Sequence, residues 1–158
     1  MTELTMDLIG DTEILFTRHF KGTPEQVYRA HTEPRLLQQW LLGPEGWSMP
    51  VCISDPRPGG HFRYEWVKGS QGFHITGEYN DVRPNSHMDH VERMFLPERT
   101  PDNHVITDFV ADGTGTQMTM RMKVPDRATR DAMLATGMTT GMEASYARLD
   151  GQTVTETA

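Results

Sequence analysis

The stretch from Asp126 to Asp150 constrains the fold most, because it is the longest segment that the sequence predicts as one uninterrupted helix. Apolar residues recur in it at three- and four-residue spacing and make one broad apolar stripe. Pro125 and Asp126 form a start signal, and Gly151 is a stop signal. The stripe consists of Leu134, Met138, Met142, Ser145 and Leu149, with Met133, Gly141 and Tyr146 at its margins. The chain before this helix therefore needs to supply a surface that the stripe can cover.

Polar residues of the same stretch fall mostly off the stripe, and we predict a solvated face from them. They are Arg127, Arg130, Asp131, Thr139, Thr140, Glu143 and Arg148. Gly137 and Gly141 interrupt the pattern. A glycine inside a helix costs about 1 kcal/mol relative to alanine, so we expect a bend, a close approach or a ligand contact that compensates at these positions.

Two short helices precede the region of strands. A first strand is predicted from Glu13 to Phe20. Thr23, Pro24 and Gln26 then form a capping box with proline at the first helical position, so a helix begins at Pro24. A second short amphipathic helix follows, and Gly43-Pro44 ends it.

From Trp47 to Val124 the apolar period changes to two, and turn residues recur at short intervals. About six antiparallel strands are predicted here, and their short connections favour a meander. We therefore expect an α+β fold in a single domain over residues 1–158, with a curved antiparallel sheet of about six to seven strands wrapped around the long C-terminal helix. Such a sheet often leaves a space beside the helix, which is where we place a ligand.

Composition narrows the class of protein. The single cysteine, Cys52, excludes an internal disulfide and suits a reducing compartment. The segment from Met1 to Asp11 lacks the pattern of a signal peptide, and no run of apolar residues is long enough to span a membrane. The formal charge of −7 argues against a nucleic-acid or anionic-membrane partner. We expect a cytoplasmic protein, and a homodimer is left open.

The seven histidines do not form a recognisable metal motif. His87 and His90 are three residues apart on a predicted strand, so their side chains point to opposite faces. His61 and His74 belong to adjacent predicted strands, but no carboxylate or cysteine is spaced to complete a site. We expect no metal and no other cofactor.

The predicted strand from Met88 to Met94 carries the candidate catalytic pair. If Met88 and Met94 point inward, His90 and Glu92 point inward with them. A histidine and a carboxylate on one face can share a proton and act as general acid and base. Two other interpretations are a satisfied polar pair at the mouth of the sheet and the opposite register, with Val91 inward.

Methionine and aromatic residues are the candidate ligand contacts. Methionine occurs eleven times, which indicates either adaptable core filling or a cavity that reshapes around varied apolar ligands. The aromatic residues are core by default, and some could also line a cavity. The predicted ligand-binding residues are Trp40, Tyr64, Trp66, Phe73, Tyr79, Phe109, Met118, Met120, Met122, Met138, Met142 and Tyr146.

Several segments together resemble the bacterial single-domain proteins of the activator of Hsp90 ATPase homologue family, within the START-like, Bet v 1-like superfamily labelled SRPBCC. The resemblance extends from about Ile14 to Leu149. It rests on Phe20 to Ala30, Thr32-Glu33-Pro34, Trp40, Gly43-Pro44, the turn from Asp55 to Gly60, and Gly115-Thr116. The resemblance implies a helix-grip fold with an internal cavity between the sheet and the C-terminal helix.

The resemblance also frames three functions. Superfamily relatives bind lipids, sterols and polyketides, so the leading hypothesis is the binding of a small hydrophobic or aromatic molecule in the cavity. Some relatives cyclise aromatic polyketides, so a second hypothesis is a cyclase- or hydrolase-like enzyme that uses His90 and Glu92. The family name comes from eukaryotic co-chaperones, which gives a third hypothesis, a module that interacts with a chaperone.

Overall fold

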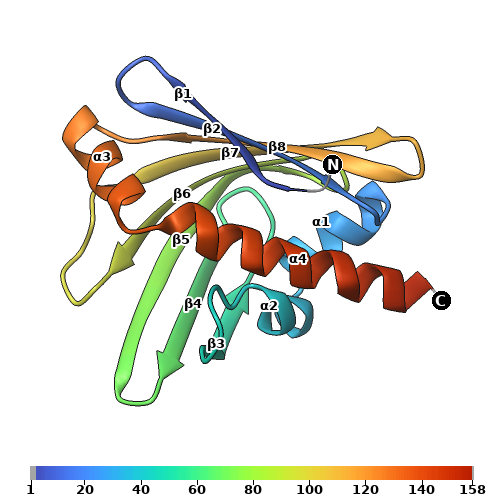
Figure 1. Ribbon diagram of the computed structural model, residues 1–158, viewed down its shortest axis with the longest axis horizontal. Coiled ribbons are helices and arrows are strands. Elements are labelled where there is room, and N and C mark those ends of the chain that lie inside the picture. Colours follow the sequence, from blue (N-terminus) through green and yellow to red (C-terminus); the bar gives the residue numbers. More distant parts are fainter. Residues whose placement is uncertain (1–2, 158) are drawn as a thin grey trace.

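A computed structural model of the protein describes residues 3–157 and the side chains of residues 3–152. Figure 1 shows a strongly curved sheet whose concave side faces one long helix, α4. In chain order the elements are β1 (Thr5–Ile9), β2 (Glu13–Phe20), α1 (Pro24–Thr32), α2 (Pro34–Trp40), β3 (Ser48–Ser54), β4 (His61–Lys68), β5 (Gln71–Arg83), β6 (His87–Phe95), β7 (Asn103–Asp112), β8 (Gly115–Lys123), α3 (Arg127–Ala135) and α4 (Met138–Thr157).

Within residues 3–157, eight strands form one unclosed sheet in the order β1-β2-β8-β7-β6-β5-β4-β3. Each neighbouring pair is antiparallel. β3 to β8 run as the predicted meander, and β2 pairs with β8 at its far side. The helix-grip fold expected from the sequence is confirmed.

The edge strand β1 was not predicted, because its five residues are too short a run for their alternation to identify a strand. β1 pairs with β2 in a register that places Met6 opposite Phe16 and Leu8 opposite Ile14. Met6 and Leu8 are 40% and 50% exposed. A short edge strand with two exposed faces carries little sequence pattern, so backbone pairing with β2 defines it.

The prediction of one uninterrupted helix from Asp126 to Asp150 is wrong in two respects. The structure divides it into α3 and α4, and Gly137 between them has φ of 78°, a left-handed conformation. The Gly137 N–H donates to the Leu134 carbonyl at 3.3 Å, which caps α3 as left-handed glycines commonly do. The predicted stop at Gly151 is also wrong, because Gly151 is helical and α4 continues to Thr157.

The start of α1 follows the sequence closely. The Thr23 hydroxyl accepts a hydrogen bond from the Gln26 N–H at 3.2 Å, and the Gln26 side chain accepts one from the Thr23 N–H at 2.9 Å. This is the predicted capping box. The Trp40 indole N–H donates to the Ala30 carbonyl at 2.9 Å, which fixes α2 against α1.

The hydrophobic core lies between the concave face of the sheet and the helices. β8 contributes a row of buried methionines, Met118, Met120 and Met122, which are 0%, 9% and 8% exposed. Tyr146 and Leu149 reach this core from α4. The methionine row faces inward, as its alternation with polar residues predicts.

Two residues assigned to the solvated face instead contact other elements of the fold. Arg130 on α3 is 4% exposed and donates to the backbone carbonyls of Gly10 and Glu13 at 2.9 Å and 3.2 Å. Glu143 on α4 accepts two hydrogen bonds from Arg18 on β2. Long side chains at the margin of an apolar stripe can bury their stems and reach partners on other elements, which the helical pattern does not reveal.

Candidate ligand site on the concave face of the sheet

β6 places a graded row of side chains on the concave face. Met88 is 4% exposed, and the side chains of His90 and Glu92 are 12% and 23% exposed. Met94, next in the row, is partly buried against the core. The structure thus places His90 and Glu92 inward, and the alternative register with Val91 inward does not occur. Exposure of the side chains in this row therefore increases from Met88 toward Glu92.

His90 and Glu92 contact each other directly. The His90 Nε2 atom lies 2.7 Å from a Glu92 carboxylate oxygen. A carboxylate accepts hydrogen bonds, so Nε2 carries a proton, and in the neutral form of the ring the lone pair then lies on Nδ1. That Nδ1 atom is buried and has no hydrogen-bond partner among the described residues. The Phe62 ring packs edge-on against the imidazole, with 5.1 Å between ring centroids.

A second imidazole, that of His31 on α1, lies in the same interior. Its Nδ1 N–H donates to the Val27 carbonyl at 2.8 Å. Burial lowers the pKa of His31 to about 4, so the ring is neutral at pH 7. Its Nε2 atom is buried without a hydrogen-bond partner among the described residues. The Trp40 and Phe109 rings surround it at centroid distances of 4.9 Å and 5.1 Å.

His31 was not among the site residues predicted from the sequence. The available signal is its spacing: His31 follows Val27 by four residues and Tyr28 by three, on the buried side of α1. This spacing is equally typical of a core histidine, and only the structure shows that Nε2 of His31 lacks a hydrogen-bond partner among the described residues.

Tyrosine hydroxyls add further polar groups to the concave face. The Ser54 and Tyr79 hydroxyls lie 3.1 Å apart. Burial raises the pKa values of Tyr64 and Tyr79. Burial likewise raises the pKa of Tyr146, whose hydroxyl faces the Met120 sulfur at 3.9 Å. These tyrosines are therefore neutral O–H groups in an apolar surrounding.

The predicted ligand-binding residues fall into a deep floor and a partly exposed rim. The floor consists of Trp40, Tyr64, Trp66, Tyr79, Phe109, Met118, Met120, Met122 and Tyr146, none more than 9% exposed. Phe73, Met138 and Met142 are partly buried and pack against that floor. The floor is part of the packed core, so the role of its residues in ligand binding stays a prediction.

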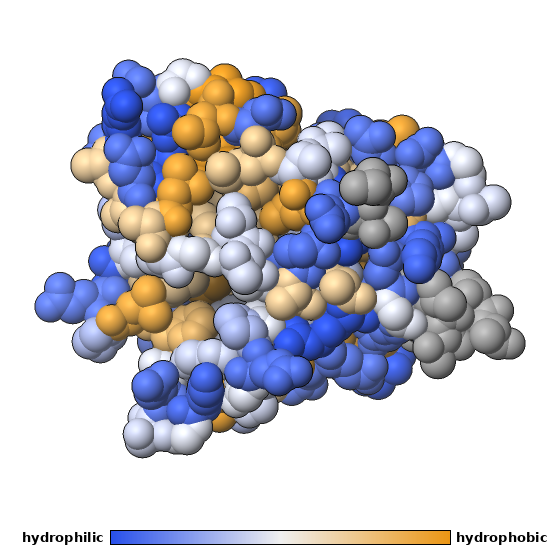
Figure 2. Space-filling view, in the orientation of Figure 1, coloured by the Kyte–Doolittle hydropathy of each residue, from blue (hydrophilic) through white to orange (hydrophobic). Residues whose placement is uncertain are grey.

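The rim consists of partly buried apolar residues that pack against the core from the sheet, from the segment before β3 and from the two C-terminal helices. Met94 on β6 and Phe73 on β5 belong to it, with Phe73 stacked on Trp66 at 4.9 Å between centroids. The other partly buried apolar residues there are Trp47, Met133, Leu134, Met138 and Met142. Figure 2 shows apolar side chains gathered around a hollow beside the start of α4, between that helix and the β4–β5 side of the sheet.

Two hollows elsewhere on the described surface have different chemistry. One, of about 320 Å³, lies between β1 and α4 and is lined by Leu4, Met6, Thr139, Thr140 and Glu143. The other, of about 430 Å³, is lined by Glu3, Thr5, Thr17, Arg18, His19, Asp112 and Gln117. The first combines the apolar side chains of Leu4 and Met6 with polar ones. The second is lined by polar and charged side chains and suits water better than an apolar ring.

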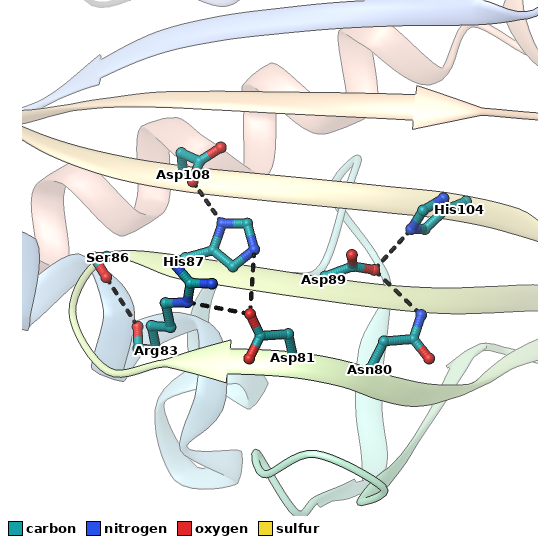
Figure 3. A network of polar contacts seen from close by, with 8 residues as sticks. All are labelled: Asn80, Asp81, Arg83, Ser86, His87, Asp89, His104 and Asp108. Carbon is teal, nitrogen blue, oxygen red and sulfur yellow. Dashed lines mark hydrogen bonds and ion pairs between the residues drawn. The ribbon is translucent and has the colours of Figure 1, made fainter.

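The convex face carries a separate network of histidines and carboxylates (Figure 3). His87 Nδ1 lies 2.6 Å from Asp108, and His104 Nε2 lies 2.7 Å from Asp89. His87 therefore points away from His90, as their odd spacing predicts. Within residues 3–157, no three His, Cys, Asp or Glu side chains are grouped to hold a metal ion.

Comparison with protein families accounts for this architecture. The profile of the family described as "Activator of Hsp90 ATPase homolog 1-like protein" matches residues 21–152, which is most of the chain. The chain belongs to this family. A search among curated proteins gave no match for this family member.

Solved structures show the same fold as this family member. A crystal structure of a protein from Rhodobacter sphaeroides is 30% identical and superposes with a TM-score of 0.91, covering 97% of this chain and 99% of that one. A protein from Nitrosomonas europaea is 19% identical, with a TM-score of 0.83 and coverage of 95% and 99%. A protein from Mycobacterium smegmatis is 18% identical, with a TM-score of 0.82 and coverage of 96% and 95%.

Proposed function

We propose that the protein binds a small hydrophobic or aromatic molecule on the concave face of the sheet, beside the start of α4. The observation that carries this proposal is the gradient along β6. Exposure rises from Met88 through His90 to Glu92 and leads to a rim of incompletely buried apolar residues. An apolar rim that the chain leaves partly exposed would gain from covering by a ligand.

The expected affinity is modest. Covering about 300 Å² of apolar surface would contribute roughly 7 kcal/mol before association costs are subtracted. Micromolar to millimolar binding follows unless polar contacts add to it. The methionine side chains at Met94, Met138 and Met142 are flexible enough to adapt to more than one ring shape.

Thermal-shift and calorimetric screens with fatty acids, sterols and flavonoid-like aromatics test this function. A Met94→Lys variant places a charge at the rim and should weaken binding of any hit. The matched control is Val110→Lys, at a position that is 62% exposed. Equal loss or retention of binding in the two variants would show that the ligand binds elsewhere, and a screen without hits would contradict the proposal.

An enzymatic function is the second candidate, favoured by the 2.7 Å contact between His90 and Glu92. The carboxylate would hold the imidazole so that the unprotonated Nδ1 faces the interior and can accept a proton from a bound substrate. Glu92 would stabilise the imidazolium that results. This arrangement suits proton abstraction in a cyclisation or in the activation of water for hydrolysis.

The enzymatic function is tested on compounds that the screen identifies. His90→Ala should abolish turnover while ligand affinity changes by less than about tenfold, since one neutral hydrogen bond contributes about 1 kcal/mol. Glu92→Gln should slow turnover and retain the ring position. His104→Ala, on the convex face, is the control and should leave turnover unchanged; unchanged turnover in His90→Ala would exclude the catalytic role.

A chaperone-interacting function is supported by the family description, which refers to activation of the Hsp90 ATPase. A pull-down with that chaperone and an ATPase assay in the presence of this protein test it. Absence of both retention and stimulation would contradict it. The cytoplasmic location and a homodimer also stay predictions; among residues 3–157, no helix has the length and apolar character needed to cross a bilayer.

A further inference from the structure

Two buried imidazole nitrogens on the concave face lack hydrogen-bond partners. They are Nε2 of His31 and Nδ1 of His90. Buried polar atoms in proteins are nearly always hydrogen-bonded, and one left without a partner loses free energy relative to its hydrated state. Two such atoms in one interior indicate that something outside the polypeptide bonds to them.

Both nitrogens are acceptors when the rings are neutral. In His31, Nδ1 donates to the Val27 carbonyl, so the lone pair lies on Nε2. In His90, Nε2 donates to the Glu92 carboxylate, so the lone pair lies on Nδ1. In each ring a fixed acceptor elsewhere in the protein determines the tautomer.

The two rings share one interior. His90 is close enough to His31 that a charge on it would oppose protonation of His31, and this adds to the effect of burial on the His31 pKa. Two lone pairs cannot hydrogen-bond to each other, so proximity alone does not satisfy either nitrogen. What both need is a hydrogen-bond donor from outside the two rings.

The surrounding side chains limit the chemistry of that donor. Aromatic rings flank both imidazoles: Trp40, Phe109, Phe20 and Tyr146 at His31, and Phe62 and Tyr79 at His90. A charged ammonium group would lose its hydration there, whereas a neutral hydroxyl on an aromatic ring would bury its apolar body and still donate.

We infer that the ligand is a hydroxylated aromatic compound whose O–H group donates to His31 Nε2 or His90 Nδ1. This inference rests on the proposed binding function and adds which class of ligand the site prefers. The two imidazole nitrogens offer lone pairs only, so a ligand group that pairs with them should be a phenol rather than the methyl ether of the same ring system, because the ether has no proton to donate and leaves the nitrogens unpaired.

The test compares 2-naphthol with 2-methoxynaphthalene by titration calorimetry at neutral pH. In the natural protein we expect 2-naphthol to bind at least about fivefold more tightly, which is the effect of one neutral hydrogen bond. In His31→Leu and in His90→Leu the preference should shrink, and in the double variant the two compounds should bind about equally. His104→Leu, on the convex face, should keep the full preference.

Each outcome decides the inference. Equal binding of the two compounds to the natural protein would mean that water satisfies the two nitrogens, and the inference would be wrong while the binding function stood. A preference that survives the double variant would also overturn it. If neither compound binds while the broader screen yields other ligands, the inference is wrong and the binding function stands; if that screen also yields no ligand, both fail. Circular dichroism establishes that each variant is folded, and the two single variants give independent readings if the double variant is not.

Discussion

Arg18 on β2 and Glu143 on α4 form a two-point ion pair that joins the sheet to the long helix. Arg18 Nε lies 3.0 Å from Glu143 Oε1, and Nη2 lies 2.9 Å from Oε2. A third contact, 3.2 Å, joins Nη1 to Asp150, about two helical turns further along α4. Arg18 is 2% exposed. The guanidinium thus holds two carboxylates of one helix from inside the core.

Replacing Arg18 by methionine should destabilise the protein by about 3 kcal/mol, because the substitution removes the buried positive charge that balances the two carboxylates. Asp150, whose side chain is 9% exposed, would be affected more than Glu143, at 32%. Urea unfolding at neutral pH measures the change.

Arg127→Met is the matched control for that experiment. Arg127 is 68% exposed and pairs with Asp131 at 3.7 Å. An exposed pair of this kind contributes less than about 1 kcal/mol. A loss at Arg18 no larger than the loss at Arg127 would show that the buried ion pair does not hold the helix.

Substitution by alanine should change the free energy of unfolding in opposite directions at Gly137 and Gly141. Gly137→Ala should lose about 1 kcal/mol, since φ of 78° is unfavourable for a residue with a Cβ atom. Gly141→Ala should be neutral or stabilising by up to about 1 kcal/mol, because the new methyl group would lie 3.5 Å from Pro44, an ordinary contact. Equal losses of stability in the two variants would show that the chain is not broken between α3 and α4 by a left-handed residue at Gly137.

Gly77 on β5 should not tolerate alanine. A Cβ atom there would lie 2.1 Å from the Phe62 ring and 2.7 Å from the Val91 carbonyl oxygen. Phe62 in turn packs against His90, so the substitution should move both rings and destabilise the protein by about 2 kcal/mol. Chemical denaturation measures the loss, and NMR chemical shifts of the His90 ring report its movement; unchanged stability and shifts would show that the ring of Phe62 does not depend on this glycine.

His31 should make stability fall as the solution is acidified. Its pKa is about 4 in the folded protein, below the ordinary value of 6.5, so the unfolded chain binds a proton first as the pH falls. Stability is therefore full above pH 6.5, declines between 6.5 and about 4, and loses up to about 3 kcal/mol from this group.

The measurement compares unfolding at about pH 7 and about pH 4.5 for the natural protein and His31→Phe. The variant should lose less stability across this interval, whatever its stability at neutral pH. His61→Gln, at an exposed position, serves as the control and should keep the full pH dependence. An identical pH dependence in His31→Phe would show that this ring is already hydrated in the folded protein.

Local patterns in the sequence specified much of the architecture. The capping box at Thr23, the period of two across the meander, and the alternation of Met118, Met120 and Met122 each reflect short-range constraints on backbone and side-chain direction. The same alternation placed His90 and Glu92 on one face of β6. These features follow from residues a few positions apart, so the sequence alone was sufficient for them.

Tertiary structure decided the features that depend on distant partners. Arg18 interrupts an apolar strand in the sequence, and only the arrival of α4 more than a hundred residues later supplies its two carboxylates. The local pattern of α1 does not show that His31 Nε2 would be buried without a hydrogen-bond partner among the described residues. The physical reason is that hydrogen bonds and ion pairs between elements are set by packing geometry, whereas periodicity specifies only which side of an element faces inward.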